Sequence, residues 1–265
     1  MKIGIVGIGV VGSAIKEGFE KLGHSVVYHD IAYNTKVEDV LGADVCYICV
    51  PTPSKTSGQC DTSIVEKVTH ELCEHGYKGI IAIKSTVEPG TTIRLIEQTG
   101  CKNICFVPEF LRERCAVADF IENHDLCVIG TNSDEIYNLI KESHGSYPKK
   151  FVKLTIKEAE FVKYFNNVYN ATLITFANNF CELCDKSGVN YANVKNAIVN
   201  RKHIYNAYLD CNDNFRGFGG VCLPKDTRAL AYMSSNFSTN GKLFERIIEE
   251  NTKYRTTVQK GMRDE

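Results

Sequence analysis

The sequence lacks the features that would place the chain on a membrane or a nucleic acid. Lys and Arg (31) almost balance Asp and Glu (32), for a formal net charge of −1, so no charge excess favours an anionic partner. No apolar run approaches the roughly 20 residues of a membrane-spanning helix. The first residues read as a strand, without the basic start, apolar core and cleavage site of a signal peptide, so we expect a cytoplasmic protein.

Cysteine, by contrast, is abundant, with twelve residues. In a chain of this size without a signal peptide, reduced thiols are expected rather than a disulfide framework. Two CxxC spacings occur, at Cys46/Cys49 and Cys181/Cys184. Neither has a second CxxC or a histidine pair nearby, so the sequence predicts no metal site.

A glycine-rich motif follows the first predicted strand, residues 2–6, and opens a predicted helix. Its residues are Gly7, Ile8, Gly9, Val10, Val11 and Gly12. The next predicted strand, residues 25–29, ends at Asp30. In this context the glycines allow a pyrophosphate to approach the helix N-terminus, and the acid can accept hydrogen bonds from a ribose. The pattern predicts dinucleotide binding, with NAD favoured over NADP because a 2′-phosphate would meet the charge of Asp30.

Strands and helices then alternate as far as residue 154. Strands are expected at residues 43–50, 79–83, 104–107, 125–129 and 151–154, and helices at 62–75, after Pro89-Gly90 and at 133–144. This alternation predicts an α/β fold with a Rossmann-type, doubly wound, largely parallel sheet over residues 1–154. Polar residues follow three of the strands: Thr52, Thr86 and Glu113. They face the ligand crevice in such sheets, although each could also be an ordinary turn or surface residue.

The second half, residues 155–265, is predicted to be an all-α domain built on one long helix over residues 155–186. Apolar residues recur there at helical spacing. Glu160, Lys163 and Asn167 lie three and four residues apart and therefore on one face. That face could be a solvated polar stripe or part of a site. Shorter helices are expected at residues 189–199 and 241–259.

A loop over residues 217–226 brings one cysteine, Cys222, to a position just before a predicted helix at residues 227–233. Pro224 suits a first helical turn, and Lys225 adds a positive charge. A helix N-terminus and a lysine both favour the thiolate, which makes Cys222 a candidate nucleophile. The alternative is a buried cysteine in an ordinary turn.

The segment GFGGVCLPKD, residues 217–226, resembles the catalytic-cysteine signature of the nucleotide-sugar dehydrogenases, the UDP-glucose 6-dehydrogenase family. The segments VPTP, KSTVEPGTT, PEFLRE and AEFVKYFNN resemble further motifs of that family in the same order. The resemblance covers nearly the whole chain. It implies a Rossmann-type NAD domain followed by a helical central domain that carries the cysteine loop.

The resemblance also implies roles for individual residues. Those expected to bind NAD are Gly7, Gly9, Val10, Val11, Gly12, Asp30, Lys36, Val50, Pro51, Thr52, Thr86, Glu113 and Lys225. Those expected to bind the substrate are Glu109, Phe110, Leu111, Arg112, Lys163, Asn167, Phe218 and Gly219. Those expected to act in catalysis are Cys222, Lys163, Asn167, Asp226, Thr86 and Glu113.

The activity implied is an NAD-dependent, four-electron oxidation of a nucleotide-sugar primary alcohol to a uronate, with UDP-glucose the leading substrate. Cys222 would form a thiohemiacetal and then a thioester. GDP-mannose or a UDP-N-acetylhexosamine is the alternative substrate. A single-step β-hydroxyacid dehydrogenase is a further alternative, although that class lacks the cysteine loop. A non-catalytic NAD-binding remnant or assembly partner is the non-enzymatic hypothesis.

The sequence departs from the family pattern in three respects. The segment between Asp30 and the strand before Val50 is shorter than usual, Leu173 replaces a common basic residue, and the resemblance ends before the family's third, UDP-binding domain. The chain could therefore bind a nucleotide sugar weakly, use a smaller substrate, or need another chain. By resemblance, the 155–186 helix is expected to form a homodimer and the product to supply acidic sugars for polysaccharide synthesis.

Overall fold

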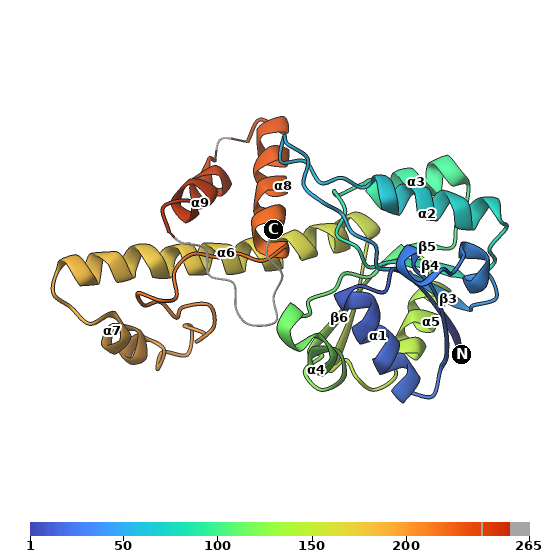
Figure 1. Ribbon diagram of the computed structural model, residues 1–265, viewed down its shortest axis with the longest axis horizontal. Helices are drawn as coiled ribbons and strands as arrows, with labels where there is room; N and C mark the ends of the chain where they lie inside the picture. Colours follow the sequence, from blue (N-terminus) through green and yellow to red (C-terminus); the bar gives the residue numbers. More distant parts are fainter. Residues whose placement is uncertain (240, 255–265) are drawn as a thin grey trace. The chain divides into compact units, whose positions relative to one another are not determined.

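The computed structural model describes residues 1–239 and 241–254, which form two compact units (Figure 1). The first unit contains Met1–Pro53 and Cys60–Lys163. The second contains Ser54–Gln59 and the described residues from Tyr164 onward. The predicted boundary after residue 154 lies near this division, and the short segment Ser54–Gln59 had no sequence signal that would group it with the second unit.

The first unit is built on a seven-stranded sheet in the order β2-β1-β3-β4-β5-β6-β7. Its strands are β1 (Lys2–Val6), β2 (Ser25–His29), β3 (Val45–Ile48), β4 (Ile80–Ile83), β5 (Ile104–Phe106), β6 (Leu126–Gly130) and β7 (Lys150–Leu154). All neighbouring pairs are parallel except β5 and β6, which meet at Phe106 and Gly130 in antiparallel register. The prediction of a doubly wound, largely parallel sheet is confirmed.

Helices cover both faces of this sheet. They are α1 (Val10–Lys21), α2 (Ser63–Glu74), α3 (Thr91–Thr99), α4 (Ala116–Ile121) and α5 (Asp134–His144), with short 3₁₀ turns η1 (Ile31–Tyr33), η2 (Val37–Val40) and η3 (Glu113–Cys115). Helix α5 begins where a polar cap is available, because the Ser133 hydroxyl accepts a hydrogen bond from the Ile136 amide. Helix α4 is short and was not predicted.

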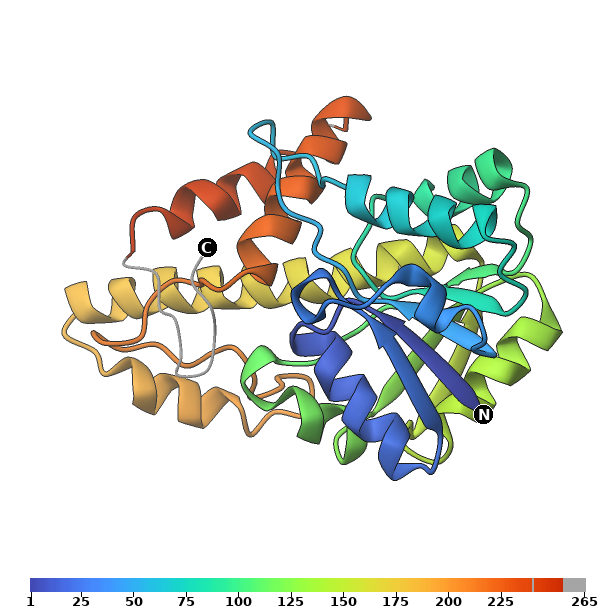
Figure 2. The same cartoon turned by 45° about the vertical axis from the view of Figure 1, so that its right-hand side comes forward.

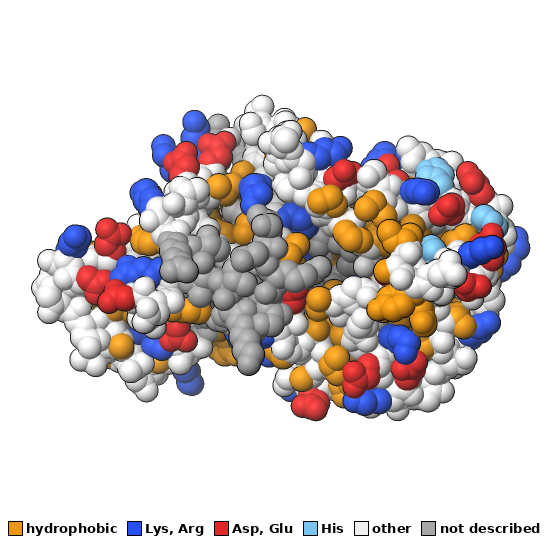
Figure 3. Space-filling model, in the orientation of Figure 1, with side chains coloured by type: hydrophobic (Ala, Val, Ile, Leu, Met, Phe, Trp, Pro, Cys, Tyr) orange, Lys and Arg blue, Asp and Glu red, His pale blue; other side chains and the backbone are white. Residues whose placement is uncertain are grey.

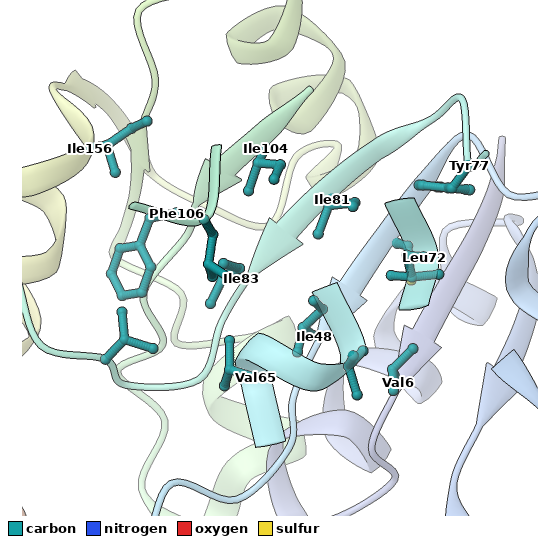
Figure 4. Packing of buried hydrophobic residues seen from close by; sticks show 14 of the residues in the cluster. Val6, Ile48, Val65, Leu72, Tyr77, Ile81, Ile83, Ile104, Phe106 and Ile156 are labelled. Atoms are coloured by element: carbon teal, nitrogen blue, oxygen red, sulfur yellow. The ribbon is translucent and has the colours of Figure 1, made fainter. Parts of the chain in front are cut away.

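The core of the first unit has one cluster on each face of the sheet. One cluster packs α2 and α3 on the strands through residues that include Val65, Leu72 and Leu95, and Figure 4 shows its side chains converging between α2 and the sheet. The other packs α1, α4 and α5 through residues that include Phe19 and Phe120. Strands buried on both faces read as continuous apolar runs, which is why the sequence located them well.

The second unit is helical and is dominated by α6 (Ile156–Lys186), which spans 31 residues and begins in the first unit (Figure 2). The other helices are α7 (Tyr191–Ile198), α8 (Cys222–Asn236) and α9 (Leu243–Asn251). Buried Cys181 and Cys184 of α6 pack with Tyr191 of α7. The prediction of a helical part built on one long helix is confirmed.

Two helix boundaries differ from prediction by more than three residues. Helix α8 begins at Cys222 rather than Thr227, because Pro224 falls in the first turn, where its missing N–H breaks no helical hydrogen bond. Helix α9 ends at Asn251 rather than residue 259. The predicted stretch from residue 255 to 259 lies outside the described residues.

One face of the molecule carries both signs of charge. Lysine and arginine side chains alternate with aspartate and glutamate side chains over the face shown in Figure 3. Among the residues that the structure describes, no helix is long and apolar enough to cross a membrane. Within the same residues, none of the twelve cysteines forms a disulfide.

Candidate active site

The glycine-rich loop joins β1 to α1 in the first unit. Gly7 has a φ of +93°, and a side chain there would approach the Cys49 carbonyl oxygen to 2.7 Å. A side chain at Gly12 would lie 1.9 Å from the Gly7 carbonyl oxygen. Both positions therefore require glycine for the fold itself.

Gly9 differs from its two neighbours in the motif. A Cβ added there would meet no other atom of the protein within 4 Å, and Gly9 caps α1 without a side-chain hydrogen bond. The first amides of a helix have no partner within the helix. Open space before these amides is what a pyrophosphate requires, so the loop fits a dinucleotide.

Asp30 links the end of β2 to the same loop. Its Oδ2 accepts a hydrogen bond from the Ile8 amide at 2.6 Å, and its Oδ1 accepts one from the Ala32 amide at 2.8 Å. A carboxylate can accept about four hydrogen bonds, so these two leave capacity for ribose hydroxyls. The geometry fits the predicted role of this residue toward NAD.

A buried ion pair lies beneath the carboxyl ends of β4 and β5. Lys84 Nζ is 3.1 Å from Glu109 Oε2, and both side chains are almost fully buried. Burial opposes the charge on each group, but mutual attraction outweighs it, so the pKa of Lys84 is raised and that of Glu109 is lowered. Lys84 is not among the residues that the sequence predicts for the site, and it lies 25 positions from its partner.

Lys163 of α6 reaches the same segment. Its ammonium donates a hydrogen bond to the main-chain carbonyl of Glu109 and lies 5.7 Å from the centre of the Phe110 ring. The Glu109 carboxylate also accepts from the Phe110 amide at 2.7 Å. The PEFLRE segment and Lys163, predicted to contact substrate, are thus brought together within the first unit.

The rest of the PEFLRE segment is held by Asp119 of α4. Arg112 donates to it through both its main-chain amide and its guanidinium, with distances of 2.6 and 2.9 Å for the latter. Burial raises the pKa of Asp119, but Arg112 outweighs this effect and leaves it lowered. The Arg112 side chain is therefore paired within the protein, and Glu113 follows it as the first residue of η3.

Glu160 anchors the beginning of α6 and was not assigned a role from the sequence. Its carboxylate is fully buried and accepts hydrogen bonds from the amides of Gly90 and Thr92 at the start of α3. Burial raises its pKa, although these two bonds oppose the rise. A buried carboxylate at a helix N-terminus is a stabilising arrangement, so the polar face of α6 is not simply solvated.

In the second unit, a buried hydrogen-bond network joins α6 to α8. The Asn167 amide donates to Asp226 Oδ2 at 2.6 Å. Lys225 Nζ lies 2.6 Å from Asp226 Oδ1. All three residues are buried, so the network pairs the charges that burial would otherwise penalise.

Cys222 begins α8 close to this network in sequence and is exposed. The glycine loop before it includes Gly217 and Gly220, both with φ near +70° (+71° and +72°). The N-terminal turn of a helix stabilises negative charge. The exposed first-turn position suits a nucleophilic thiolate, as the sequence predicts.

The remaining predicted cofactor residues lie on loops of the first unit. Thr52 is buried after β3, and Thr86 is half-buried after β4, where its carbonyl accepts from the Cys60 thiol at 3.5 Å. Lys36 is exposed and caps η2. Val50, Pro51 and Leu111 also lie on these loops. Their contacts with ligands stay predictions.

Comparison with known proteins decides the family. Residues 31–146 match the NAD binding domain of the UDP-glucose/GDP-mannose dehydrogenase family, and residues 157–253 match its central domain. The chain belongs to this family. The NAD cofactor predicted from the glycine loop is therefore the cofactor of the matched domain.

Relatives of known sequence and structure agree with the family assignment. The chain is 30% identical to UDP-glucose 6-dehydrogenase TuaD of Bacillus subtilis over 97% of this chain and 64% of that protein. It is 35% identical to UDP-glucose 6-dehydrogenase of Rickettsia bellii over 81% of this chain and 50% of that protein. A UDP-glucose dehydrogenase structure from Pyrobaculum islandicum superposes with a TM-score of 0.87, at 26% identity over 95% of this chain and 68% of that one.

The chain thus spans between 50% and 64% of the length of the first two of these relatives. No group of three or more potential metal ligands is placed to hold an ion among the residues that the structure describes.

Proposed function

We propose that the chain carries the chemistry of an NAD-dependent nucleotide-sugar 6-dehydrogenase, with UDP-glucose the leading substrate and UDP-glucuronate the product. The observation that carries this proposal is the exposed Cys222 in the first turn of α8, followed by the buried network of Lys225, Asp226 and Asn167. A single-step alcohol dehydrogenase has no use for such a thiol.

NAD, when bound, accepts hydride from the substrate carbon in each of two oxidations. After the first, the Cys222 sulfur adds to the aldehyde carbon and the carbonyl oxygen takes a proton, which gives a thiohemiacetal. The second oxidation removes the hydrogen on the same carbon as hydride, and the hydroxyl group loses its proton, which gives a thioester. Water attacks the thioester carbon, releases the uronate and returns the thiol.

Lys163 and Asn167 lie four positions apart on α6 and thus on the same face. We assign them to the stabilisation of oxyanions, by charge and by hydrogen bonding respectively. Asp226, Thr86 and Glu113 are assigned to proton transfer and water positioning. GDP-mannose is the alternative substrate, because the matched family acts on both classes.

The test counts NADH formed per nucleotide sugar consumed, over a panel that includes UDP-glucose, GDP-mannose and UDP-N-acetylhexosamines. We expect two NADH per substrate for the wild-type chain. Cys222→Ala should yield no uronate, whereas Cys73→Ser, which changes a half-buried thiol of α2 in the first unit, should retain the ratio of two. Turnover of Cys222→Ala to the uronate at the wild-type rate would contradict the mechanism. NAD binding without turnover on any member of the panel would support the non-catalytic alternative.

A homodimer through α6 is the oligomeric state we propose. Large apolar side chains recur on the helix every three to seven positions and are exposed: Phe165, Tyr169, Phe176, Phe180 and Leu183. Such a stripe is typical of a helix that packs against a partner. Phe176→Glu should convert the dimer to a monomer in sedimentation experiments. A wild-type monomer at micromolar concentration would contradict this proposal. The cytoplasmic location of the protein stays a prediction.

A further inference from the structure

The loop that precedes Cys222 is held by a side chain from α9. Asn251, the last residue of α9, accepts a hydrogen bond from the Phe218 amide at 2.8 Å and donates one to the Phe218 carbonyl at 2.9 Å. One side-chain amide therefore satisfies both main-chain groups of a single residue. This pairing resembles that of neighbouring strands in a sheet, although no strand is present at this point of the second unit.

The Phe218 side chain is also fixed. It is 3% exposed and packs with Ala171 of α6 and Ile247 of α9. Because the residue as a whole is almost excluded from water, the main-chain amide and carbonyl of Phe218 also need protein partners. Asn251 supplies both of them, so the position of Phe218 depends directly on α9.

A second asparagine holds the preceding residue. Asn178 of α6 is buried, and its carbonyl oxygen accepts from the Gly217 amide at 3.1 Å. Its own amide donates to the Ile174 carbonyl at 2.7 Å. Gly217 and Phe218 are thus attached to two helices, and only Gly219, Gly220 and Val221 separate them from the thiol.

We propose that Asn251 is a positioning residue for Cys222. By fixing the start of the glycine loop, Asn251 holds the Cys222 thiol ready to capture the aldehyde. This inference rests on the proposed function. The first oxidation needs no thiol, whereas the second needs the sulfur placed at the aldehyde carbon. Loss of the Asn251 bonds should therefore affect the two oxidations unequally.

The first experiment compares Asn251→Ala with wild type by NADH stoichiometry, with hydroxylamine present to trap free aldehyde. We expect the ratio of NADH to substrate to fall from two toward one, trapped aldehyde to appear, and kcat for uronate to fall at least tenfold. Asn251→Asp keeps the acceptor for the Phe218 amide and loses the donor to the Phe218 carbonyl. Its ratio of NADH to substrate should therefore lie between those of wild type and Asn251→Ala. Simple destabilisation would lower all rates and leave the ratio at two.

The matched control is Asn200→Ala. Asn200 also lies at a helix end, following α7, and donates to the carbonyls of Asn196 and Ala197. It should retain wild-type stoichiometry. A ratio of two for Asn251→Ala, with kcat within twofold of wild type, would overturn the proposal.

A second measurement does not depend on turnover. Amide hydrogen exchange of a peptide covering residues 216–223 should be at least tenfold faster in Asn251→Ala than in wild type, and unchanged in Asn200→Ala. An unchanged rate of amide hydrogen exchange in Asn251→Ala would overturn the proposal that Asn251 holds the loop. If wild type forms no NADH with any nucleotide sugar, the proposed function fails, while hydrogen exchange still decides whether Asn251 holds the loop.

Discussion

The side-chain amide of Asn167 donates a 2.6 Å hydrogen bond to the carboxylate of Asp226, 59 positions away along the chain. This bond fixes the first turns of α8 to the middle of α6. Because Lys225 binds the other carboxylate oxygen, Asp226 keeps a charged partner when Asn167 is removed.

Asn167→Ala should therefore separate catalysis from stability. We expect a loss of about 1.5–3 kcal/mol in the free energy of unfolding, the usual value of a hydrogen bond to a charged group, and a fall in kcat of about 10²–10³-fold, typical of a lost oxyanion donor. Urea unfolding and steady-state NADH production measure the two effects. Asn179→Ala, an exposed position on the same helix that donates to the Thr175 carbonyl, is the control. A kcat within threefold of wild type would remove the catalytic role.

The glycine loop permits a matched pair of substitutions. Gly9→Ala adds a methyl group where no protein atom lies within 4 Å, so the fold should be unaffected while NAD binding weakens by at least tenfold. Gly12→Ala places the same group 1.9 Å from the Gly7 carbonyl oxygen and should destabilise the first unit. Isothermal titration with NAD and thermal unfolding distinguish the two. Wild-type affinity in Gly9→Ala would show that the cofactor does not approach this loop.

Removing Lys84 should leave a buried charge without its partner. Lys84→Met keeps the side-chain volume, but the Glu109 carboxylate stays buried at the carboxyl ends of β4 and β5. Breaking such a pair lowers the free energy of unfolding by about 3–5 kcal/mol. Lys84→Met combined with Glu109→Gln should recover part of this loss, since neither charge is then present. Urea unfolding near neutral pH provides the comparison. A loss below about 1 kcal/mol in the single variant would mean that the pair is not buried as described.

The first unit should lose stability in mild acid through His144. This side chain is fully buried against Phe19 and Phe120, and burial holds its pKa well below the ordinary value. The unfolded chain then binds more protons than the folded one, so the free energy of unfolding falls as pH drops below about 6.5.

Urea unfolding at pH 7.5 and 5.5 tests this effect. Wild type should lose at least about 1 kcal/mol more than His144→Leu between these pH values, since one pKa unit corresponds to about 1.4 kcal/mol. His203→Gln, which alters an exposed histidine of the second unit, should behave as wild type. Equal losses in wild type and His144→Leu would assign the acid sensitivity to other groups.

The sequence predicted what depends on local pattern. Buried parallel strands and the long helix follow from apolar runs and helical spacing, and the glycine loop follows from a motif with a steric cause. The β5–β6 reversal and helix α4 carry no such periodic signal.

The missed site residues share another property. Lys84, Glu160 and Asn251 act through partners 25, 68 to 70 and 33 positions away, and such contacts depend on the tertiary structure. From sequence alone, an acidic residue or an asparagine on a helix is predicted to be exposed, because its hydrogen-bond partner is not known. A lysine directly after the apolar strand Ile80–Ile83 was the one available signal in the sequence, because a lysine that is buried there needs a counter-charge.

Helix α6 carries Lys163 and Asn167 on successive turns of a single continuous rod. Each residue advances an α-helix by about 100°, since a turn takes about 3.6 residues. A single inserted residue between these two positions would swing Asn167 to another side of the helix, and a deletion would do the same in the opposite sense. The four-residue interval is thus intolerant of length change, whereas the loop over residues 201–216 can vary in length without altering that phase.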